Sequence, residues 1–156
     1  MFKTLASLFL LGATALPAAA QISQPELYVV MFRADWCAPC KVVEPRLNGA
    51  LRSLGDPSIE PVMFDISDPG LGEVAAHRAF DREIVPQYNR WLGLTGFAAI
   101  IDATSKQTLG CVNSKFSADE IAQEVRRHTL MAAGRAVKTD ASTFQKTTEC
   151  PPAHNK

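Results

Sequence analysis

The stretch Leu27-Tyr28-Val29-Val30-Met31-Phe32, followed shortly by Trp36-Cys37-Ala38-Pro39-Cys40, decides the fold. The first part is a short apolar run rich in β-branched and aromatic residues, which predicts a buried strand. From Cys40 onward, apolar residues recur at helical spacing until the turn signal at 55–57. The sequence therefore predicts a strand, a pair of cysteines two residues apart, and then a helix over 40–54 in which Pro45 introduces a kink.

The rest of the chain contains similar signals. Periodicity predicts strands over 59–66, 97–101 and 107–112, helices over 71–80 and 85–91, and a last helix from Ser117 to Gly134. Ser117 and Glu120 have the spacing of a capping box. The short link between the last two strands predicts an antiparallel hairpin, whereas parallel strands need helical crossovers. The predicted fold class is α/β, with a central mixed sheet of about four strands flanked by helices.

Length and charge limit the function. A chain of 156 residues, 47% of them hydrophobic, suits one globular domain. Sixteen basic residues balance sixteen acidic ones, and the basic residues form no stripe along the sequence. We therefore expect no nucleic-acid partner.

The first twenty residues have the pattern of an export signal. Lys3 is followed by an apolar run over 5–16 and by the small residues Pro17-Ala18-Ala19-Ala20. The alternative is a membrane anchor, but this run is shorter than the roughly twenty residues that a spanning helix needs. We expect a signal peptide over 1–20, a domain over 21–133 in the periplasm without stable membrane association, and a polar tail over 134–156.

Export matters for the four cysteines, because disulfides persist outside the cytoplasm. Cys37 is expected at the start of the helix, where unpaired N–H groups and the helix dipole stabilise a thiolate. Cys40, one turn further, is the natural resolving thiol. Pro39 stiffens the ring that the two sulfurs close, and Trp36 provides an apolar platform for a substrate.

Other roles for the cysteines remain open. A zinc site would need further ligands, but no second CxxC exists and the three histidines are scattered, so we expect no metal. Cys111 and Cys150 either form a disulfide that fastens the tail or remain a buried thiol and a free tail thiol. The even cysteine count favours the disulfide.

The segment Phe32-Arg33-Ala34-Asp35-Trp36-Cys37-Ala38-Pro39-Cys40-Lys41 resembles the active-site signature of thioredoxins, Phe-x-Ala-x-Trp-Cys-x-Pro-Cys-Lys. The resemblance covers about residues 26 to 133. It implies a thioredoxin-like fold without a cofactor, with Cys37 as nucleophile and Cys40 as resolving thiol. It also implies protein thiols or disulfides as partners and, together with the signal, the exported branch of the family. A protein that works as a reductant there needs a membrane electron donor.

The sequence departs from the thioredoxin pattern at three positions. Within Gly96-Phe97-Ala98-Ala99, Ala98 stands where the family carries a cis-proline, and a trans bond is expected because cis costs about 2.5–4 kcal/mol before other residues. Phe97 and Ala98 are then expected along the substrate-binding edge. Met31 and Met63 stand where cytosolic members carry a buried Asp and its Lys partner.

These observations predict an exported thiol:disulfide oxidoreductase that acts as a reductant or as an isomerase partner. The alternative is a thioredoxin-fold module that binds a protein or a metal such as Cu(I) or Zn²⁺, with little redox turnover.

Overall fold

The computed structural model describes residues 24–134 and 149–153. The expected signal peptide over 1–20 lies outside the described residues, as does most of the expected tail. Within the described ranges, no helix is long and apolar enough to cross a membrane.

All eight predicted helices and strands are present, with ends within two residues of the prediction. Their bounds are β1 Leu27–Arg33, α1 Cys40–Leu54, β2 Ile59–Asp65, α2 Pro69–Asp81, α3 Val85–Arg90, β3 Phe97–Asp102, β4 Thr108–Asn113 and α4 Ala118–Ala132. The helix α2 begins two residues earlier than predicted, because the Asp68 side chain accepts a hydrogen bond from Leu71 N–H and Pro69 suits the first turn. The predicted capping box of Ser117 and Glu120 starts α4.

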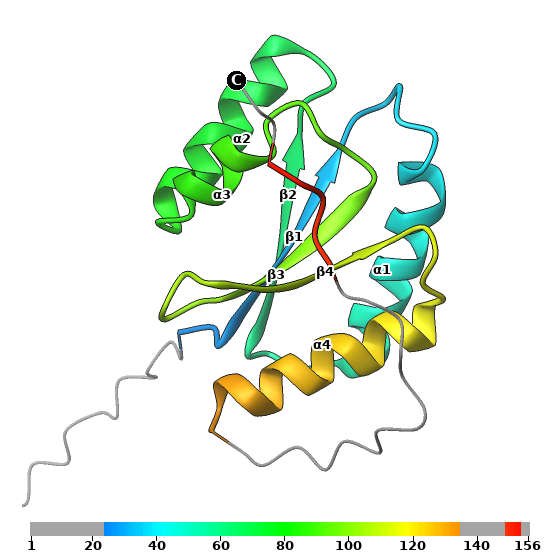
Figure 1. Cartoon of the computed structure of the whole chain (residues 1–156), viewed down its shortest axis with the longest axis vertical. Helices are drawn as coiled ribbons and strands as arrows, with labels where there is room; N and C mark the ends of the chain where they lie inside the picture. The colour runs from blue at the N-terminus through cyan, green and yellow to red at the C-terminus, as the bar shows by residue number, and fades with distance from the viewer. Residues whose placement is uncertain (1–23, 135–148, 154–156) are drawn as a thin grey trace, which may run out of the picture.

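The four strands form one mixed sheet in the order β2-β1-β3-β4. β1 runs parallel to β2 and antiparallel to β3, and β3 forms the predicted antiparallel hairpin with β4. Figure 1 shows α1 and α4 on one side of the sheet and α2 and α3 on the other. Because β1 is covered on both faces, its residues from Leu27 to Phe32 are apolar without alternation.

One face of the sheet carries an aromatic core. Phe32 stacks on Phe97, and both rings meet Trp91 edge to face. Trp91 is 1% exposed. Interlocked rings of this kind contribute more than their buried area alone, so this face is the rigid base of the segment that leads from β1 to the cysteines.

The segment over 149–153 is fastened to this face. Cys150 is bonded to Cys111 of β4, the pairing that the sequence favours, and packs against the aromatic core. Trp91 Nε1 donates a hydrogen bond to the Pro151 carbonyl at 2.9 Å. The two attachments hold this segment across the sheet.

The opposite face contains two polar residues that the apolar pattern of α4 does not predict. Glu124 and His128 are 2% and 3% exposed, and Glu124 Oε1 lies 3.0 Å from His128 Nε2. Glu124 also pairs with Arg127. A buried carboxylate needs such partners to offset its lost hydration.

Candidate active site

Cys37 and Cys40 lie where β1 passes into α1 and are joined by a disulfide with a Cα–Cα distance of 5.4 Å. The helix begins at Cys40 with Pro39 as its N-cap, so Cys37 precedes it in a turn closed by Cys37 N–H on the Ala34 carbonyl. The sequence places Cys37 at the helix start itself. The helix start can still stabilise a thiolate on Cys37, because Cys40 N–H, at the start of the helix, donates to Cys37 Sγ at 3.1 Å.

The disulfide lies just under the surface. Cys37 is 4% exposed and Cys40 2%, whereas Trp36 is 64% exposed and Ala38 and Pro39 are also exposed. The sulfur of Cys40 faces inward, 3.8 Å from the Phe32 carbonyl oxygen. A partner that docks on Trp36 and the exposed turn would therefore meet Cys37 before Cys40.

Gly96 closes the other side of the disulfide, and sequence reasoning missed this role. Its N–H donates to the Phe32 carbonyl at 2.9 Å. A Cβ atom added to Gly96 would lie 2.8 Å from Pro39 Cβ and 3.5 Å from Cys37 Sγ. Its φ of +91° is also one that side chains disfavour. The two glycines at 93 and 96 indicate a turn, but no sequence signal shows what the turn approaches.

Phe97 and Ala98, which are expected along the substrate-binding edge, lie at the start of β3. Phe97 is 2% exposed and belongs to the aromatic core, while Ala98 is fully buried between Met31 and Val112 in the sheet. The register of β3 carries both side chains into the sheet and leaves Gly96 beside the disulfide. Their place on the substrate-binding edge stays a prediction. No described peptide bond is cis, so the expected trans bond between Phe97 and Ala98 is present.

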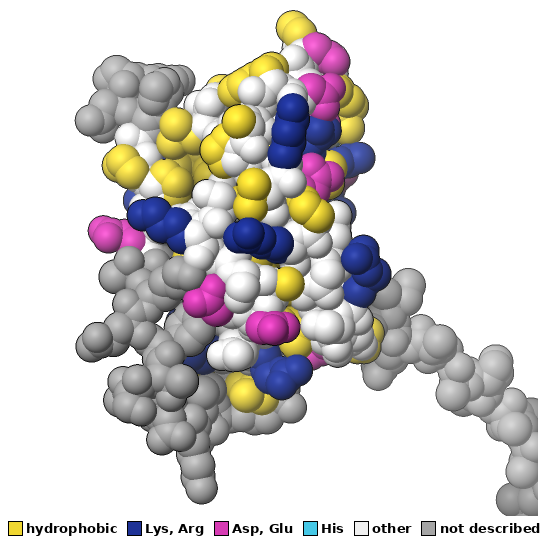
Figure 2. All heavy atoms as spheres, turned by 90° about the vertical axis from the view of Figure 1, so that its right-hand side faces the viewer, with side chains coloured by type: hydrophobic (Ala, Val, Ile, Leu, Met, Phe, Trp, Pro, Cys, Tyr) yellow, Lys and Arg dark blue, Asp and Glu magenta, His cyan; other side chains and the backbone are white. Residues whose placement is uncertain are grey.

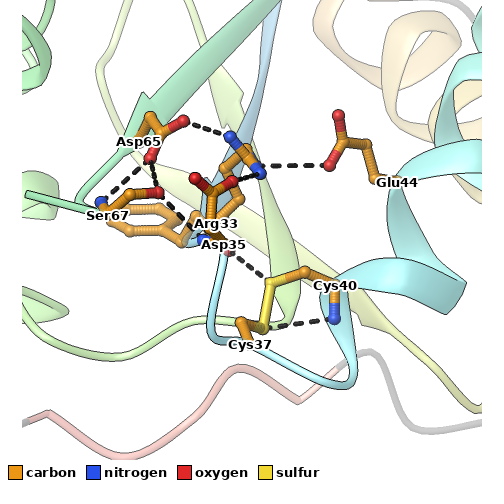
Figure 3. The surroundings of a disulfide bond; sticks show 8 residues. Arg33, Asp35, Cys37, Cys40, Glu44, Asp65 and Ser67 are labelled. Atoms are coloured by element: carbon orange, nitrogen blue, oxygen red, sulfur yellow. Dashed lines mark hydrogen bonds and ion pairs between the residues drawn. A yellow bond between two sulfur atoms is a disulfide. The ribbon is translucent and has the colours of Figure 1, made fainter. Parts of the chain in front are cut away.

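A network of charges stands beside the cysteines, centred on Arg33 at the end of β1 (Figure 3). Arg33 pairs with Asp35 at 2.5 Å, with Asp65 of β2, and through Nε with Glu44 of α1 at 3.3 Å. The hydrogen bond to Asp35 and the neighbouring carboxylates raise the pKa of Arg33. The guanidinium is therefore a permanent cation that joins β1, β2 and α1.

Ser67 connects the cysteine turn to the end of β2. Its hydroxyl accepts a hydrogen bond from Asp35 N–H at 2.9 Å and donates to Asp65. Burial raises the pKa of Asp65, but hydrogen bonds from Ser67 and the charge of Arg33 outweigh burial and lower it overall. Arg33 and Asp35 lie 32 positions before Asp65 and Ser67 in the sequence, which is why pattern analysis does not group the two pairs.

Met31 and Met63 occupy opposite positions in the register of β1 and β2. Met31 is 2% exposed, so the layer behind Cys40 contains a thioether where thioredoxins carry a carboxylate. Among the described residues, no group of three or more His, Cys, Asp or Glu side chains could hold a metal ion.

On the face shown in Figure 2, which looks toward α1, basic and acidic side chains are interspersed with apolar ones. No side of this view is covered by charge of one sign.

Comparison with known proteins was made for sequence and for structure. The thioredoxin family model matches residues 18–69, which include β1, both cysteines of the turn and β2. No curated protein matches the chain.

Several solved structures are similar at low identity. A thiol:disulfide interchange protein of the thioredoxin family from Chlorobium tepidum is 20% identical over 67% of this chain and 80% of its own, with a TM-score of 0.47. A secreted Mycobacterium tuberculosis disulfide oxidoreductase, described as homologous to E. coli DsbE, is 20% identical over 67% and 83%, with a TM-score of 0.44. Fasciola hepatica thioredoxin is 20% identical over 67% and 83%, with a TM-score of 0.41.

The family match contains the signature around the cysteines and two of the four strands of the sheet, β1 and β2. Residues 18–69 therefore match the thioredoxin family model, and within them Cys37 and Cys40 form the CxxC pair.

Proposed function

We propose that this protein is a periplasmic thiol:disulfide oxidoreductase that reduces protein disulfides, as a general reductant or as the partner of an isomerase. The observation that carries the proposal is the Cys37–Cys40 disulfide in the turn before α1, under an exposed Trp36. Two thiols in this position can form and reopen a small ring without moving the sheet.

The cysteine pair supplies both steps of the reaction. The Cys37 thiolate attacks one sulfur of a substrate disulfide, so a mixed disulfide forms and the first substrate thiolate leaves. Cys40 then attacks Cys37 Sγ, which releases the second substrate thiolate and leaves Cys37 bonded to Cys40. Two electrons pass from the dithiol to the substrate. The hydrogen bond from Cys40 N–H supports Cys37 as the nucleophile, because it stabilises negative charge on that sulfur.

The place of action and the partners follow from the export pattern of residues 1–20 and the exposed turn. Outside the cytoplasm, an oxidised pair must be reduced again by a donor that brings electrons across the membrane. We therefore propose protein disulfides as substrates and a membrane electron donor as the source of reduction.

Insulin reduction tests the activity. The mature protein, with dithiothreitol as electron source, should accelerate precipitation of the insulin B chain, and the Cys37→Ser variant should not. The matched control is the double variant Cys111→Ser, Cys150→Ser, which lacks the other disulfide and should keep the activity. Turnover that persists in Cys37→Ser, or that is absent from the wild type, would contradict the proposal.

Export is tested separately on the full chain. Expressed in a bacterium with two membranes, it should be recovered from the periplasmic fraction with a mass that corresponds to loss of residues 1–20. Recovery of the intact chain from the cytoplasm or the membrane would contradict a cleaved signal.

A further inference from the structure

Trp91 contacts both the aromatic base of the cysteine turn and the segment over 149–153. It directly follows α3 and is 1% exposed. Its ring belongs to the apolar cluster that also contains Phe32 and Cys111, and Cys150 packs against this cluster. The proposed reaction, as described so far, uses neither Trp91 nor the disulfide between Cys111 and Cys150, which is called the second disulfide below.

Phe32 connects Trp91 to Cys40. The centroids of the Phe32 and Trp91 rings are 5.6 Å apart, with the planes at 82°. The carbonyl oxygen of Phe32 lies 3.8 Å from Cys40 Sγ, and Figure 3 marks this contact by the dashed line from the Cys40 sulfur to the end of β1. In the dithiol, the Cys40 sulfur carries a proton that this oxygen can accept, whereas in the disulfide it carries none. The hydrogen bond therefore exists only in the reduced protein and favours the dithiol.

Gly96 and Phe97 fix the position of the same carbonyl. Gly96 N–H donates to the Phe32 oxygen at 2.9 Å, and a carbonyl oxygen can accept a second hydrogen bond. The ring of Phe97, the next residue, stacks on Phe32 with the centroids 4.8 Å apart and meets Trp91 at 5.6 Å. Trp91 thus packs on the rings of both strands that meet at this carbonyl. In a close-packed interior, a smaller ring at this position would let both of them shift.

The segment over 149–153 in turn holds Trp91. Trp91 Nε1 donates to the Pro151 carbonyl at 2.9 Å, and a buried indole N–H needs such an acceptor. Cys150, the residue before Pro151, is bonded to Cys111 of β4, which is itself 1% exposed. Figure 1 shows this segment in red, passing the end of α3. The second disulfide therefore fixes the acceptor that orients the Trp91 ring.

We propose that Trp91 is a positioning residue for the redox pair and that the second disulfide supports it. By keeping the Phe32 carbonyl opposite Cys40, Trp91 stabilises the dithiol relative to the disulfide. A larger fraction of Cys37 and Cys40 then stays in the reduced form that the proposed reaction consumes. This inference rests on the proposed function, because it concerns the reduction potential of the same cysteine pair.

Reduction of the pair by glutathione is the equilibrium that reports this effect. Two glutathione thiols each supply one electron and one proton, the Cys37–Cys40 bond breaks, two S–H bonds form, and one glutathione disulfide is produced. One of the new S–H bonds donates to the Phe32 carbonyl. The equilibrium constant for reduction therefore includes the contribution of this hydrogen bond.

The test measures this constant in variants. The mature protein is equilibrated in buffers of reduced and oxidised glutathione, and free thiols are trapped by alkylation. Mass spectrometry of the peptides then gives the reduced fraction of Cys37 and Cys40 separately from that of the second disulfide. In Trp91→Phe, which keeps a ring but cannot donate to Pro151, we expect the constant to fall about threefold, or about 14 mV in potential. This is near the lower end of what one hydrogen bond contributes, because a thiol is a weak donor.

The double variant Cys111→Ser, Cys150→Ser removes the support and leaves Trp91 in place. The constant should fall in the same direction, by no more than in Trp91→Phe. Adding Trp91→Phe to this variant should give no more than the effect of Trp91→Phe alone, because both changes act through one ring. Insulin turnover in excess dithiothreitol should persist, since both redox thiols remain. This variant also tests the inference if Trp91→Phe does not fold.

The matched control is Tyr88→Phe on the same face of the sheet. It removes the hydrogen bond from the Tyr88 hydroxyl to the Gly72 carbonyl at 3.0 Å and keeps the ring that meets Phe64. Its stability in urea should fall, but its constant with glutathione should equal that of the wild type. A residue that only supports the structure would show the same behaviour as this control.

Three results would overturn the inference. They are a constant that is unchanged or raised in Trp91→Phe or in the double cysteine variant, an equal fall in Tyr88→Phe, and effects of the first two variants that simply add. Absence of insulin turnover from the wild type concerns the proposed function alone, so the two failures are distinguishable.

Discussion

Gly96 shows how much a single residue can determine at this site. Its missing side chain leaves the space that Pro39 and Cys37 occupy, and its φ is +91°. We expect Gly96→Ala to lower the free energy of unfolding by about 2–4 kcal/mol. The alanine would have to adopt a disfavoured φ, and its Cβ would press on Pro39. Urea unfolding of the oxidised protein measures the change.

The chain offers a matched control for the backbone part of this effect. Gly93 has nearly the same φ, +89°, but a Cβ there would meet nothing within 4 Å. Gly93→Ala should therefore cost only about 1–2 kcal/mol, the price of the left-handed conformation. Equal losses in the two variants would mean that the contact with Pro39 and Cys37 contributes nothing.

At this scale the sequence predicts the cysteine pair and not its surroundings. Cys37 and Cys40 are recognisable because their spacing, the preceding strand and the following helix are all local features. Gly96 approaches Cys37 from fifty-nine positions away, and the register of β3 determines which residue of the turn does so. The resemblance to thioredoxins instead aligns Ala98, two residues further along the chain, with the family's proline.

At the scale of elements, β1 and β2 are joined at their ends by a charged pair. Arg33 and Asp65 are register partners at the end of both strands and form an ion pair. Elements themselves are predictable because apolar periodicity and caps are local: the bounds of β1, α1 and α4 follow from the sequence within two residues. The pairing of charges across strands cannot be predicted in this way, because it depends on the register of the sheet.

This pair predicts a specific sensitivity to acid. Because the pKa of Asp65 is lowered in the folded protein, its contribution to stability is complete above the ordinary aspartate value of about 3.9 and is lost as the pH falls through the lowered value. Asp65→Asn should be less stable than the wild type near pH 7. It should also lose less stability on acidification.

Urea unfolding at a series of pH values from about 7 to 3 measures the difference in unfolding free energy between the wild type and Asp65→Asn. This difference should narrow as the pH falls. The control is Asp81→Asn at the exposed end of α2, whose stability should follow the wild type across the series. A difference between Asp65→Asn and the wild type that is constant with pH would contradict a role of the charge.

At the scale of the whole molecule, the order of strands and helices is sufficient to predict the layered α/β fold. Each helix must bury its apolar stripe, and the parallel pair β1 and β2 needs a crossover, so few topologies remain. The attachment of residues 149–153 is different. The even cysteine count only favours the Cys111–Cys150 pair, and the bond from Trp91 to the Pro151 carbonyl has no counterpart in any sequence signal.

The two disulfides should consequently differ in what they stabilise. Cys111 and Cys150 are separated by 39 positions and Cys37 and Cys40 by 3. In the chain-entropy model, the long loop contributes about 4 kcal/mol and the short ring about 2 kcal/mol. The double variant Cys111→Ser, Cys150→Ser should therefore lose more stability in urea than the double variant Cys37→Ser, Cys40→Ser. In excess dithiothreitol, which reduces the disulfides of the wild type too, both variants should be as stable as the wild type. If the Cys111 and Cys150 variant unfolds at the wild-type urea concentration without reductant, the disulfide does not restrict the unfolded chain, and its role is limited to holding residues 149–153 against the aromatic core.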